Sequence, residues 1–596
     1  MGISNLASIE KPWMKYYPDT ISQDNLPHCT MYQQIKMSCE AGHWSGNTAL
    51  YFYGTEITYR EMFARIDQYA GAFASLGVKK GEYVSVVSVS TPESICALYA
   101  LNRLGAVCNL IDPRTDAVHT KAYIKKAKSR ILITLEMNYE QVADSLDELG
   151  LEYVIAQTPL TSMPFMKRAA LKIAGKGRFN IPYDGKRVFR DADFFKSGAG
   201  KTFEEVPYEP DMPAVVVRTG GTTGLSKGVV LTNDNMNALA SSFYATIQVK
   251  KPNEAFLNFL PLAVSYGIAV GVHMALTMGI RDILIPKFDP DKLDQLILKY
   301  KPQHIIGVPV FYEKMINSPL MKGKDLSYIE TMAAGGDSAS GALEDKLDEF
   351  RLTHGIEYPI AQGYGMSEVG SAASFGFRNV HRKGSTGIPC CYTTIAAFKP
   401  GTEEELPLGE TGELYISGPT IMKEYLDEPQ ETAAIRITHQ DGRVWVHSGD
   451  LGYVDEDGFV FIVGRIKRSI IRFDGHKVYP LQIENVVMQH KAVNNCAVVP
   501  VRDKNHMQGE YPLICVEADC EQSERSAVAA EVLKLCKEQI ELRSQPVGVV
   551  FVDAIPLTQS AKNDVKKLTE EYYNYNYSGT KAKKLTKKIA KRKSNG

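Results

Sequence analysis

The chain has 596 residues, and its 68 lysines and arginines nearly balance 69 acidic residues. That length exceeds what one hydrophobic core supports, so at least two domains are expected. The balanced charge argues against a protein that binds nucleic acid over its whole surface. Ten cysteines without a Cys-x-x-Cys pair or zinc-finger spacing argue against a zinc module and favour a reducing compartment.

The first residues carry neither a basic start nor an apolar core, so no secretory signal is predicted. Leu6 stands where a myristoylation signal requires Ser or Thr. We therefore expect a cytoplasmic protein.

The first part of the chain alternates helix and strand signals. Thr58 and Glu61 form a capping box before a helix that ends near Gly77, and residues 83–89 follow as a buried strand. Thr91 opens a second helix, and residues 107–111 form the next strand. This alternation predicts βαβ units and a parallel sheet.

Residues 164–178 form a basic amphipathic segment. Met166, Ala169, Ala170 and Ile173 share a helical face, which five lysines and arginines flank. Such a helix contacts a bilayer surface or rests on its own domain, and the sequence leaves both readings open.

Residues 255–280 contain no Asp, Glu, Lys or Arg, and this uncharged stretch is long enough to span a membrane. Asn258, Pro261, His273 and three glycines instead favour a buried strand, a turn and a buried helix inside a large core.

Further strands are predicted at residues 283–285, 304–308 and 331–334, each ending near a glycine or proline. Ligands of open parallel sheets collect at the carboxyl ends of the strands. Gly336, just after the last of these strands, is therefore a candidate wall for a planar base.

A glycine- and threonine-rich loop lies between two apolar runs, at residues 218–228. Glycines permit positive φ and close backbone approach, and hydroxyls and a lysine suit a polyphosphate. The spacing fails the P-loop pattern, and a plain glycine-rich hairpin is the alternative. The candidate ligands are Thr219, Gly220, Gly221, Thr222, Thr223, Gly224 and Lys227.

Four later segments carry complementary chemistry. The run at residues 362–368 offers glycines, the ring of Tyr364, the hydroxyl of Ser367 and a carboxylate, Glu368, that suits magnesium. Asp450 follows a glycine and can accept from two vicinal hydroxyls. Arg465 with Lys467, and Lys562 on a predicted loop, add cations.

Together with the loop, these segments resemble the adenylate-forming superfamily of acyl-CoA synthetases, luciferases and peptide-synthetase adenylation domains, and most closely its fatty acyl-CoA or aryl-CoA ligases. The resemblance covers roughly residues 45–570. It departs from the usual pattern at Gly220, Ser226, Asp337, Ser338 and Ala561.

The resemblance implies a role for each matching position. Thr222 and Glu368 are the expected magnesium ligands, and Lys562 is expected to act with them in catalysis. Asp450 and Arg465 are expected to contact the ribose, and Lys467 to form the hinge between domains. The remaining expected nucleotide contacts are Thr219, Gly220, Gly221, Thr223, Gly224, Lys227, Gly336, Gln362, Gly363, Tyr364, Gly365 and Ser367.

The implied fold is α/β. A large N-terminal adenylation domain, residues 1–466, is expected to contain two parallel-sheet α/β subdomains and a small β-barrel subdomain. It is hinged to a smaller α+β C-terminal domain, residues 467–574. Residues 575–596 form a basic tail, predicted to be disordered, with eight lysines and arginines after residue 580.

The implied reaction is ATP-dependent acid–thiol ligation with Mg²⁺, ATP and coenzyme A. The acid forms an acyl-AMP and pyrophosphate leaves, and the acyl group then passes to coenzyme A. Residues 260–267 lack the aspartate that holds an amino-acid substrate, and Val264 replaces a common histidine, which favours a medium- or long-chain fatty acid.

Alternatives remain open. An aryl acid, or a carrier protein in place of coenzyme A, fits the same motifs, as does a binding protein that has lost turnover. The basic segment and the tail suit a peripheral contact at the inner membrane surface. The tail equally suits RNA or a solubilising role, and no specific nucleic acid is expected.

Overall fold

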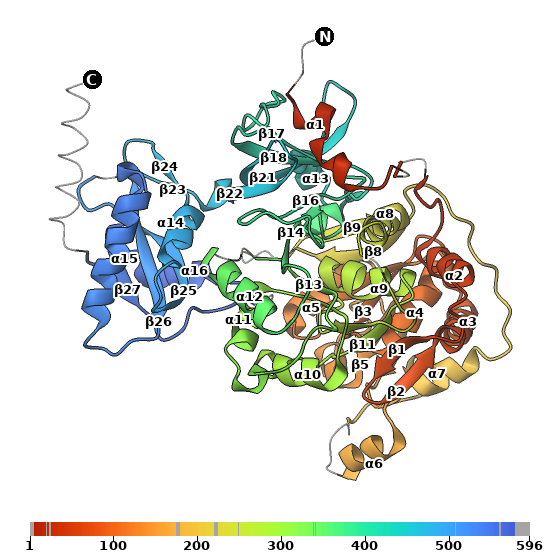
Figure 1. Cartoon of the computed structure of the whole chain (residues 1–596). Coiled ribbons are helices and arrows are strands. Elements are labelled where there is room, and N and C mark those ends of the chain that lie inside the picture. The colour runs from red at the N-terminus through yellow and green to blue at the C-terminus, as the bar shows by residue number, and fades with distance from the viewer. Residues whose placement is uncertain are drawn as a thin grey trace, which may run out of the picture.

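The computed structural model describes residues 5–19, 21–22, 25–173, 179–219, 225–247, 249–337, 339, 341–506, 508–558 and 562–577. The chain forms two large sheets whose strands interleave in sequence, a smaller antiparallel sheet and a C-terminal unit (Figure 1).

The first large sheet has eight strands, of which seven run in one direction and β9 runs opposite to its two neighbours. In spatial order they are β19 (Glu424–Tyr425), β9 (Gly228–Thr232), β8 (Pro213–Arg218), β4 (Val107–Ile111), β3 (Tyr83–Val87), β5 (Ile131–Leu135), β6 (Tyr153–Gln157) and β7 (Val188–Arg190). The antiparallel β8–β9 hairpin confirms the predicted strand, loop and strand at residues 213–232.

The second large sheet has nine strands, with a parallel centre and antiparallel edges. In order they are β16 (Ile388–Pro389), β15 (Ser374–Phe375), β14 (Ala361–Tyr364), β13 (Thr331–Ala334), β12 (His304–Gly307), β10 (Ala255–Asn258), β11 (Arg281–Leu284), β1 (Thr48–Phe52) and β2 (Thr55–Thr58). The predicted central strands are present; β13 has the predicted ends, and the ends of β11 and β12 differ by one or two residues.

Capped helices connect these strands. The side chain of Thr58 accepts from Glu61 N and begins α3 (Tyr59–Ser75), and Thr91 likewise caps α4 (Pro92–Arg103), as predicted. One hydrophobic core cluster contains residues of both sheets and of α2 (Met31–Ala41), α3, α4 and α8 (Asn233–Tyr244). The two sheets therefore belong to one body.

The long uncharged segment is buried inside that core. It forms β10, a turn, a π-helix η4 (Tyr266–Met274) and a short helix α9 (Ala275–Thr277). The predicted strand, turn and helix are confirmed, although no signal in these residues predicted π geometry. Within the described residues no helix is both long and apolar enough to cross a bilayer.

The expected barrel subdomain is a five-stranded antiparallel sheet. It contains β17 (Thr394–Phe398), β18 (Gly412–Ser417), β20 (Arg436–Thr438), β21 (Val444–Val454) and β22 (Val460–Arg465). β22 leads through the one-turn η8 (Ile466–Arg468) into the C-terminal unit.

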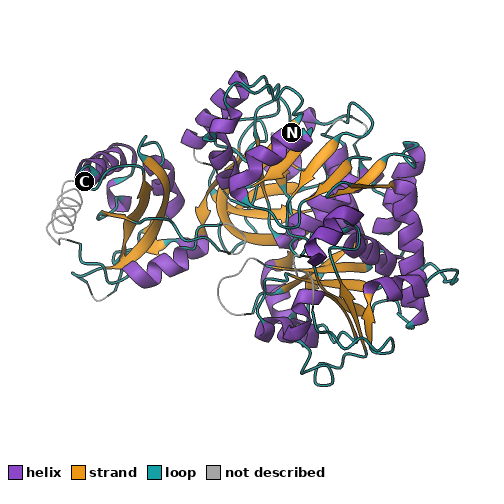
Figure 2. Ribbon diagram, turned by 90° about the horizontal axis from the view of Figure 1, so that it is seen from below, coloured by secondary structure: helices purple, strands orange, loops and turns teal. Residues whose placement is uncertain are grey.

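The C-terminal unit is α+β and lies beside the large body (Figure 2). It contains β23 (Ile470–Ile471), β24 (Lys477–Val478), α14 (Pro480–Val487), β25 (Val493–Arg502), β26 (Glu510–Ala518), α15 (Arg525–Gln539), β27 (Val549–Phe551) and α16 (Val565–Tyr572). Alternate residues of β25 and β26 fill two separate core clusters, one on each face of the sheet.

The described chain continues through Tyr577, a residue that the predicted boundary assigns to the tail. The side chain of Tyr577 is buried, and its hydroxyl donates to Arg502 O at 3.0 Å. Residues 578–596 lie outside the described part of the chain.

Candidate active site

Asp450 lies at the centre of a polar cluster on the third sheet. It sits directly opposite Arg465 in the antiparallel register of β21 and β22. Its Oδ1 accepts from Arg465 Nε at 2.8 Å, and its Oδ2 accepts from the Tyr364 hydroxyl at 2.8 Å. Asp450 is only 2% exposed, whereas the Arg465 side chain is 61% exposed. The carboxylate is therefore held in one orientation while the guanidinium stays in solvent.

The pKa values of Arg465 and Tyr364 are both raised from their usual values. The Asp450 carboxylate raises the pKa of Arg465. Burial raises the pKa of Tyr364 well above its usual value, and the nearby Asp450 adds to that effect. Tyr364 is consequently a neutral hydrogen-bond donor and Arg465 a permanent cation.

Glu368 occupies the short turn η7 (Ser367–Val369) and is buried. Its Oε1 accepts from the hydroxyl of Tyr425 at 2.6 Å. The Lys227 ammonium lies 4.7 Å from the centre of the Tyr425 ring and pairs with Glu431 of α13 (Pro429–Ile435). A lysine and a carboxylate predicted to bind the same nucleotide thus contact the same tyrosine, the lysine over its ring and the carboxylate at its hydroxyl.

The two ends of the glycine-rich loop are held together. Thr219 N donates to Lys227 O at 3.1 Å, which extends the β8–β9 hairpin. Gly220, Gly221, Thr222, Thr223 and Gly224 lie outside the described residues. Their predicted phosphate contacts remain predictions.

Arg218, immediately before this loop, is buried, and the sequence analysis missed it. Its guanidinium lies 4.2 Å from the Tyr123 ring and donates to Asn109, while Nε and Nη1 have no partner among the described residues. Burial lowers the pKa of Arg218 to about 10. The Tyr123 hydroxyl accepts from Ser226 N at 3.1 Å, so this tyrosine links the buried cation to the far end of the loop.

Lys562 reaches this cluster from the C-terminal unit. Its loop is closed by hydrogen bonds from Thr558 N to Lys562 O (2.8 Å) and from Asp564 N to Pro556 O (2.7 Å). Burial and the Arg465 guanidinium lower the pKa of Lys562, and the carboxylates of Asp337, Asp450 and Glu368 oppose that shift. Residues 559–561, including the unusual Ala561, lie outside the described part.

The glycines that follow β13 and β14 shape the predicted base-binding wall. Gly336 has φ +82°, a conformation that disfavours a side chain. A Cβ at Gly365 would lie 1.8 Å from Ser371 O, and one at Gly363 would lie 3.3 Å from Ser374 O. Only glycine fits at residue 365 without moving the backbone.

The polar side chains of this wall have protein partners. Gln362 donates to Glu344, and its Oε1 accepts from Ala339 N at 3.3 Å. Ser367 Oγ lies 3.4 Å from Arg218 O. The side-chain amide of Gln362 therefore holds α12 (Gly341–Thr353) in place. The backbone of Gln362 is the part of this residue that can line the wall.

Lys467 lies on η8 between the two domains and is exposed. Together with Lys227, it lowers the pKa of Glu431. The predicted hinge residue therefore lies near the ion pair of the phosphate loop, at the junction where a rotation would occur.

The residues present suit a magnesium ion brought in by a nucleotide. The described residues contain no group of three or more His, Cys, Asp or Glu side chains able to hold a metal. Mg²⁺ needs no such group, because one or two carboxylates, phosphates and water complete its octahedron. Tyr425 engages Oε1 of Glu368, and Oε2 has no hydrogen bond among the described residues.

Sequence reasoning identified most of this cluster and missed Arg218, Tyr123, Tyr425 and Glu431. Arg218 carried a readable signal, because an arginine that directly continues an apolar strand is unusual. Tyr425 and Glu431 carried no such signal, because their role depends on β19 pairing with the distant strand β9.

Two family models match the chain. One, described as AMP-binding enzyme, matches residues 39–426, and the other, AMP-binding enzyme C-terminal domain, matches residues 482–562. The first spans more than half of the chain, and the chain belongs to the AMP-binding enzyme family. Acid–thiol ligation through an adenylate is the activity class that this membership supports.

Relatives of known activity match most of the chain. A long-chain-fatty-acid–CoA ligase of Bacillus subtilis (strain 168) is 29% identical over 500 residues, covering 83% of this chain and 87% of the relative. A 4-coumarate–CoA ligase of Pinus taeda is 28% identical over 575 residues, covering 94% and 97%.

Solved structures confirm the predicted fold class. ATP-bound MatB from Rhodopseudomonas palustris superposes with a TM-score of 0.76 at 23% identity, covering 92% of this chain and all of that one. A benzoate CoA ligase from Burkholderia xenovorans LB400 gives 0.75 at 21% identity, covering 90% and 99%. At this identity the likeness concerns the fold alone.

Proposed function

We propose that the protein activates a medium- or long-chain fatty acid as acyl-AMP and transfers the acyl group to coenzyme A. The observation that carries the first step is that Lys562, on a loop of the C-terminal unit, interacts electrostatically with Asp450, Arg465 and Glu368 of the preceding domain. One cluster then holds the cations and hydroxyl acceptors that a nucleoside triphosphate requires.

In the first step a carboxylate oxygen attacks the α-phosphorus of ATP, and the bond to pyrophosphate breaks. Negative charge builds on the α-phosphate oxygens, so a lysine ammonium placed there lowers the barrier. Lys562 is the proposed source of that charge. A magnesium ion held by Glu368 would neutralise the phosphates further.

The ribose fits the Asp450 cluster. Each carboxylate oxygen of Asp450 accepts one protein hydrogen bond and keeps lone pairs for a second donor. Two vicinal hydroxyls can therefore bind to an acceptor that Tyr364 and Arg465 already orient, which limits the entropy lost on binding.

In the second step the thiol sulfur attacks the acyl carbon and AMP leaves. The same site cannot be complementary to both transition states, so Lys562 must withdraw. The one-turn η8 with exposed Lys467 is the proposed hinge for this rotation.

The surroundings of η4 support an acid with an apolar tail. The residues before it, Phe259, Leu260, Leu262 and Ala263, are buried. Tyr266 donates to Gly307 O at 3.2 Å, and a Cβ at Gly335 would lie 3.2 Å from the Tyr266 hydroxyl. The missing side chain at Gly335 lets the Tyr266 ring pack close to the end of β13.

A small cavity lies beside β13 of the second large sheet. It has a volume of about 30 Å³, and its lining includes Phe243, Ile247, Met332 and Phe375. That volume is close to one water molecule, so a long acyl chain requires side chains to move.

An aryl acid is the second candidate. Phe259 stacks on Phe288 with ring centres 4.2 Å apart, and Phe311 lies edge-on to Phe288 at 5.0 Å. Such a cluster can also contact a planar ring, and the Pinus taeda relative is a 4-coumarate–CoA ligase.

The test is a product assay with ATP and a panel of short, medium and long fatty acids, benzoate and 4-coumarate. Hydroxamate trapping detects the adenylate, and AMP release is followed with free coenzyme A or a pantetheinylated carrier. We expect CoA-dependent AMP release with the longer fatty acids. Release only with a carrier, or only with aryl acids, would replace the proposed acceptor or acid, and no trapped adenylate with any acid would refute enzymatic turnover.

A further inference from the structure

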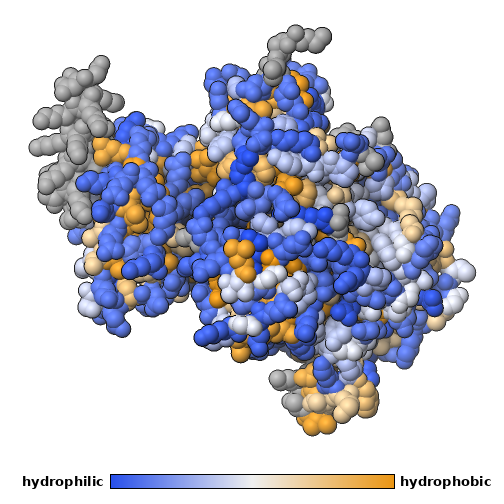
Figure 3. Space-filling view, viewed as in Figure 1, coloured by the Kyte–Doolittle hydropathy of each residue, from blue (hydrophilic) through white to orange (hydrophobic). Residues whose placement is uncertain are grey.

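Helix α6 (Phe165–Ile173) exposes a cluster of large apolar side chains. Phe165 is 73% exposed, Met166 83% and Ile173 86%. Other strongly exposed apolar residues, such as Val118 and Leu352, stand alone in their helices. In Figure 3 the apolar surface over α6 forms the tip of a protrusion from the large body.

The exposed residues share one face of the helix. At 3.6 residues per turn, Phe165, Ala169, Ile173, Met166 and Ala170 fall within an arc of roughly 140°. Lys167 lies beyond one edge of this arc and Arg168 beyond the other. The helix contains no acidic residue.

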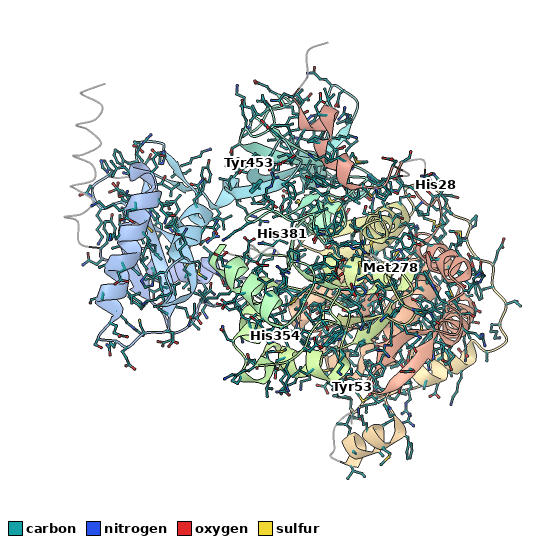
Figure 4. The ribbon with its side chains drawn as sticks, viewed as in Figure 1. His28, Tyr53, Met278, His354, His381 and Tyr453 are labelled. Atoms are coloured by element: carbon teal, nitrogen blue, oxygen red, sulfur yellow. The ribbon has the colours of Figure 1, made fainter. Side chains whose placement is uncertain are left out.

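The helix is fixed with this face outward. Lys167 Nζ donates to Tyr53 O at 2.6 Å, in the turn between β1 and β2. Tyr53 marks the root of the protruding helix in Figure 4. The reading in which the apolar face rests on its own domain is therefore wrong, since the anchor is the lysine and the apolar side chains point to solvent.

We propose that α6 docks the protein on an anionic lipid bilayer, with Phe165, Met166 and Ile173 entering the boundary between headgroups and acyl chains. Arg168 would then lie nearest the lipid phosphates, while Lys167 holds the helix to Tyr53 O and adds to its positive charge. An apolar face between cations is complementary to such a surface in both hydrophobicity and charge.

The size of the patch favours a bilayer over a protein partner. Nine residues of helix extend roughly 13 Å, too short to cross a membrane of about 30 Å. A stable protein interface buries roughly 800 Å² on each partner, far more than three side chains provide. A bilayer requires only a few inserted apolar groups with nearby cations.

Co-sedimentation of the full-length protein with vesicles tests the proposal. The vesicles contain phosphatidylcholine alone or mixed with phosphatidylglycerol. We expect binding to the mixed vesicles that salt weakens, and a loss of roughly tenfold or more in the variant Phe165→Ser, Met166→Ser, Ile173→Ser. The matched control is Val118→Ser, Met137→Ser, Leu352→Ser, which removes three equally exposed apolar residues elsewhere and should bind as the parent does.

A second readout follows insertion directly. An environment-sensitive dye on Met166→Cys should shift to shorter wavelength on mixed vesicles and not on phosphatidylcholine alone, while the dye on Met137→Cys should not shift on either. Undiminished binding of the α6 triple variant would overturn the proposal and assign any binding to another part of the chain. Equal binding to both vesicle types would overturn the role of the cations. Neither outcome depends on which acid the protein activates.

Discussion

The hydroxyl of Tyr425 donates a 2.6 Å hydrogen bond to Oε1 of Glu368, and the ring of this tyrosine lies 4.7 Å from the Lys227 ammonium. Tyr425 belongs to β19, which joins the first large sheet, whereas Glu368 lies in η7, between strands β14 and β15 of the second large sheet. This tyrosine therefore fixes the proposed magnesium ligand relative to the proposed phosphate lysine.

Tyr425→Phe should raise the magnesium concentration that adenylate formation requires, while leaving the fold intact. A hydrogen bond to a charged group contributes about 1.5–3 kcal/mol, so we expect the magnesium concentration for half-maximal adenylate formation to rise roughly tenfold. A magnesium titration of pyrophosphate release measures this. The control Tyr453→Phe removes a hydroxyl from β21 and should not change the titration, and an unchanged titration for Tyr425→Phe would contradict the positioning role.

Lys562→Ala should lose adenylate formation selectively. Removing one preorganised donor from a developing oxyanion costs roughly 10²–10³ in rate, and the same loss is expected here. Transfer from chemically supplied acyl-AMP to coenzyme A should remain within a few-fold of the parent, because Lys562 is proposed to be absent from that step. Lys566→Ala, an exposed lysine on α16, is the control. Equal losses in both half-reactions would indicate a structural defect instead.

Asp450→Asn should reduce discrimination for the ribose hydroxyls. The parent should prefer ATP over 2′-deoxy-ATP, whereas an amide accepts more weakly from a hydroxyl and should raise KM for ATP roughly tenfold. Arg465 is exposed enough for water to solvate it after the change, so folding should survive. Steady-state kinetics with both nucleotides measure the effect, and an undiminished ATP preference would place the ribose elsewhere.

Gly365→Ala should displace the wall between β14 and η7. The added Cβ would lie 1.8 Å from Ser371 O, and backbone must move to relieve it. We expect a loss of about 2 kcal/mol or more in unfolding free energy, with weaker ATP binding. Gly46→Ala meets nothing within 4 Å and should be neutral to within about 0.5 kcal/mol. Urea unfolding and nucleotide titration of both variants decide the point.

Stability should fall as pH rises through the titration of Asp191. This carboxyl is buried against Tyr69 and Gln157, and burial together with Glu93 raises its pKa from 3.8 to about 7. The folded protein therefore keeps a proton that the unfolded chain has lost, so the stabilisation is complete below about pH 4 and is lost by about pH 7.

Asp191→Asn should remove most of that dependence. Each tenfold difference in proton affinity is worth ~1.4 kcal/mol, so the parent should lose roughly 2–4 kcal/mol over this range. Urea midpoints near pH 5 and near pH 8 measure the change in parent and variant. A parent that becomes more stable over this interval, or a variant with the same slope, would contradict the assignment.

Local signals in the sequence predicted most elements accurately. Thr58 and Glu61 give their capping box whatever surrounds them, because its bonds lie within one turn. The strands β4 and β13 have the predicted ends, because each is a short apolar run that stops beside a glycine or a turn. The π geometry of η4 was missed, since packing in a crowded core and not local propensity selects it.

The sequence alone determined which chemical groups this protein carries: a glycine-rich loop, a glutamate, an aspartate and a distant lysine in a fixed order. Short motifs encode these because backbone conformation and side-chain chemistry are local properties. Only the tertiary structure decided that Lys562 interacts electrostatically with Asp450 and Glu368, that Tyr425 joins two sheets, and that the apolar face of α6 points to solvent. Each of these depends on contacts between segments far apart in the chain, and their long-range packing leaves no periodic signal in the sequence.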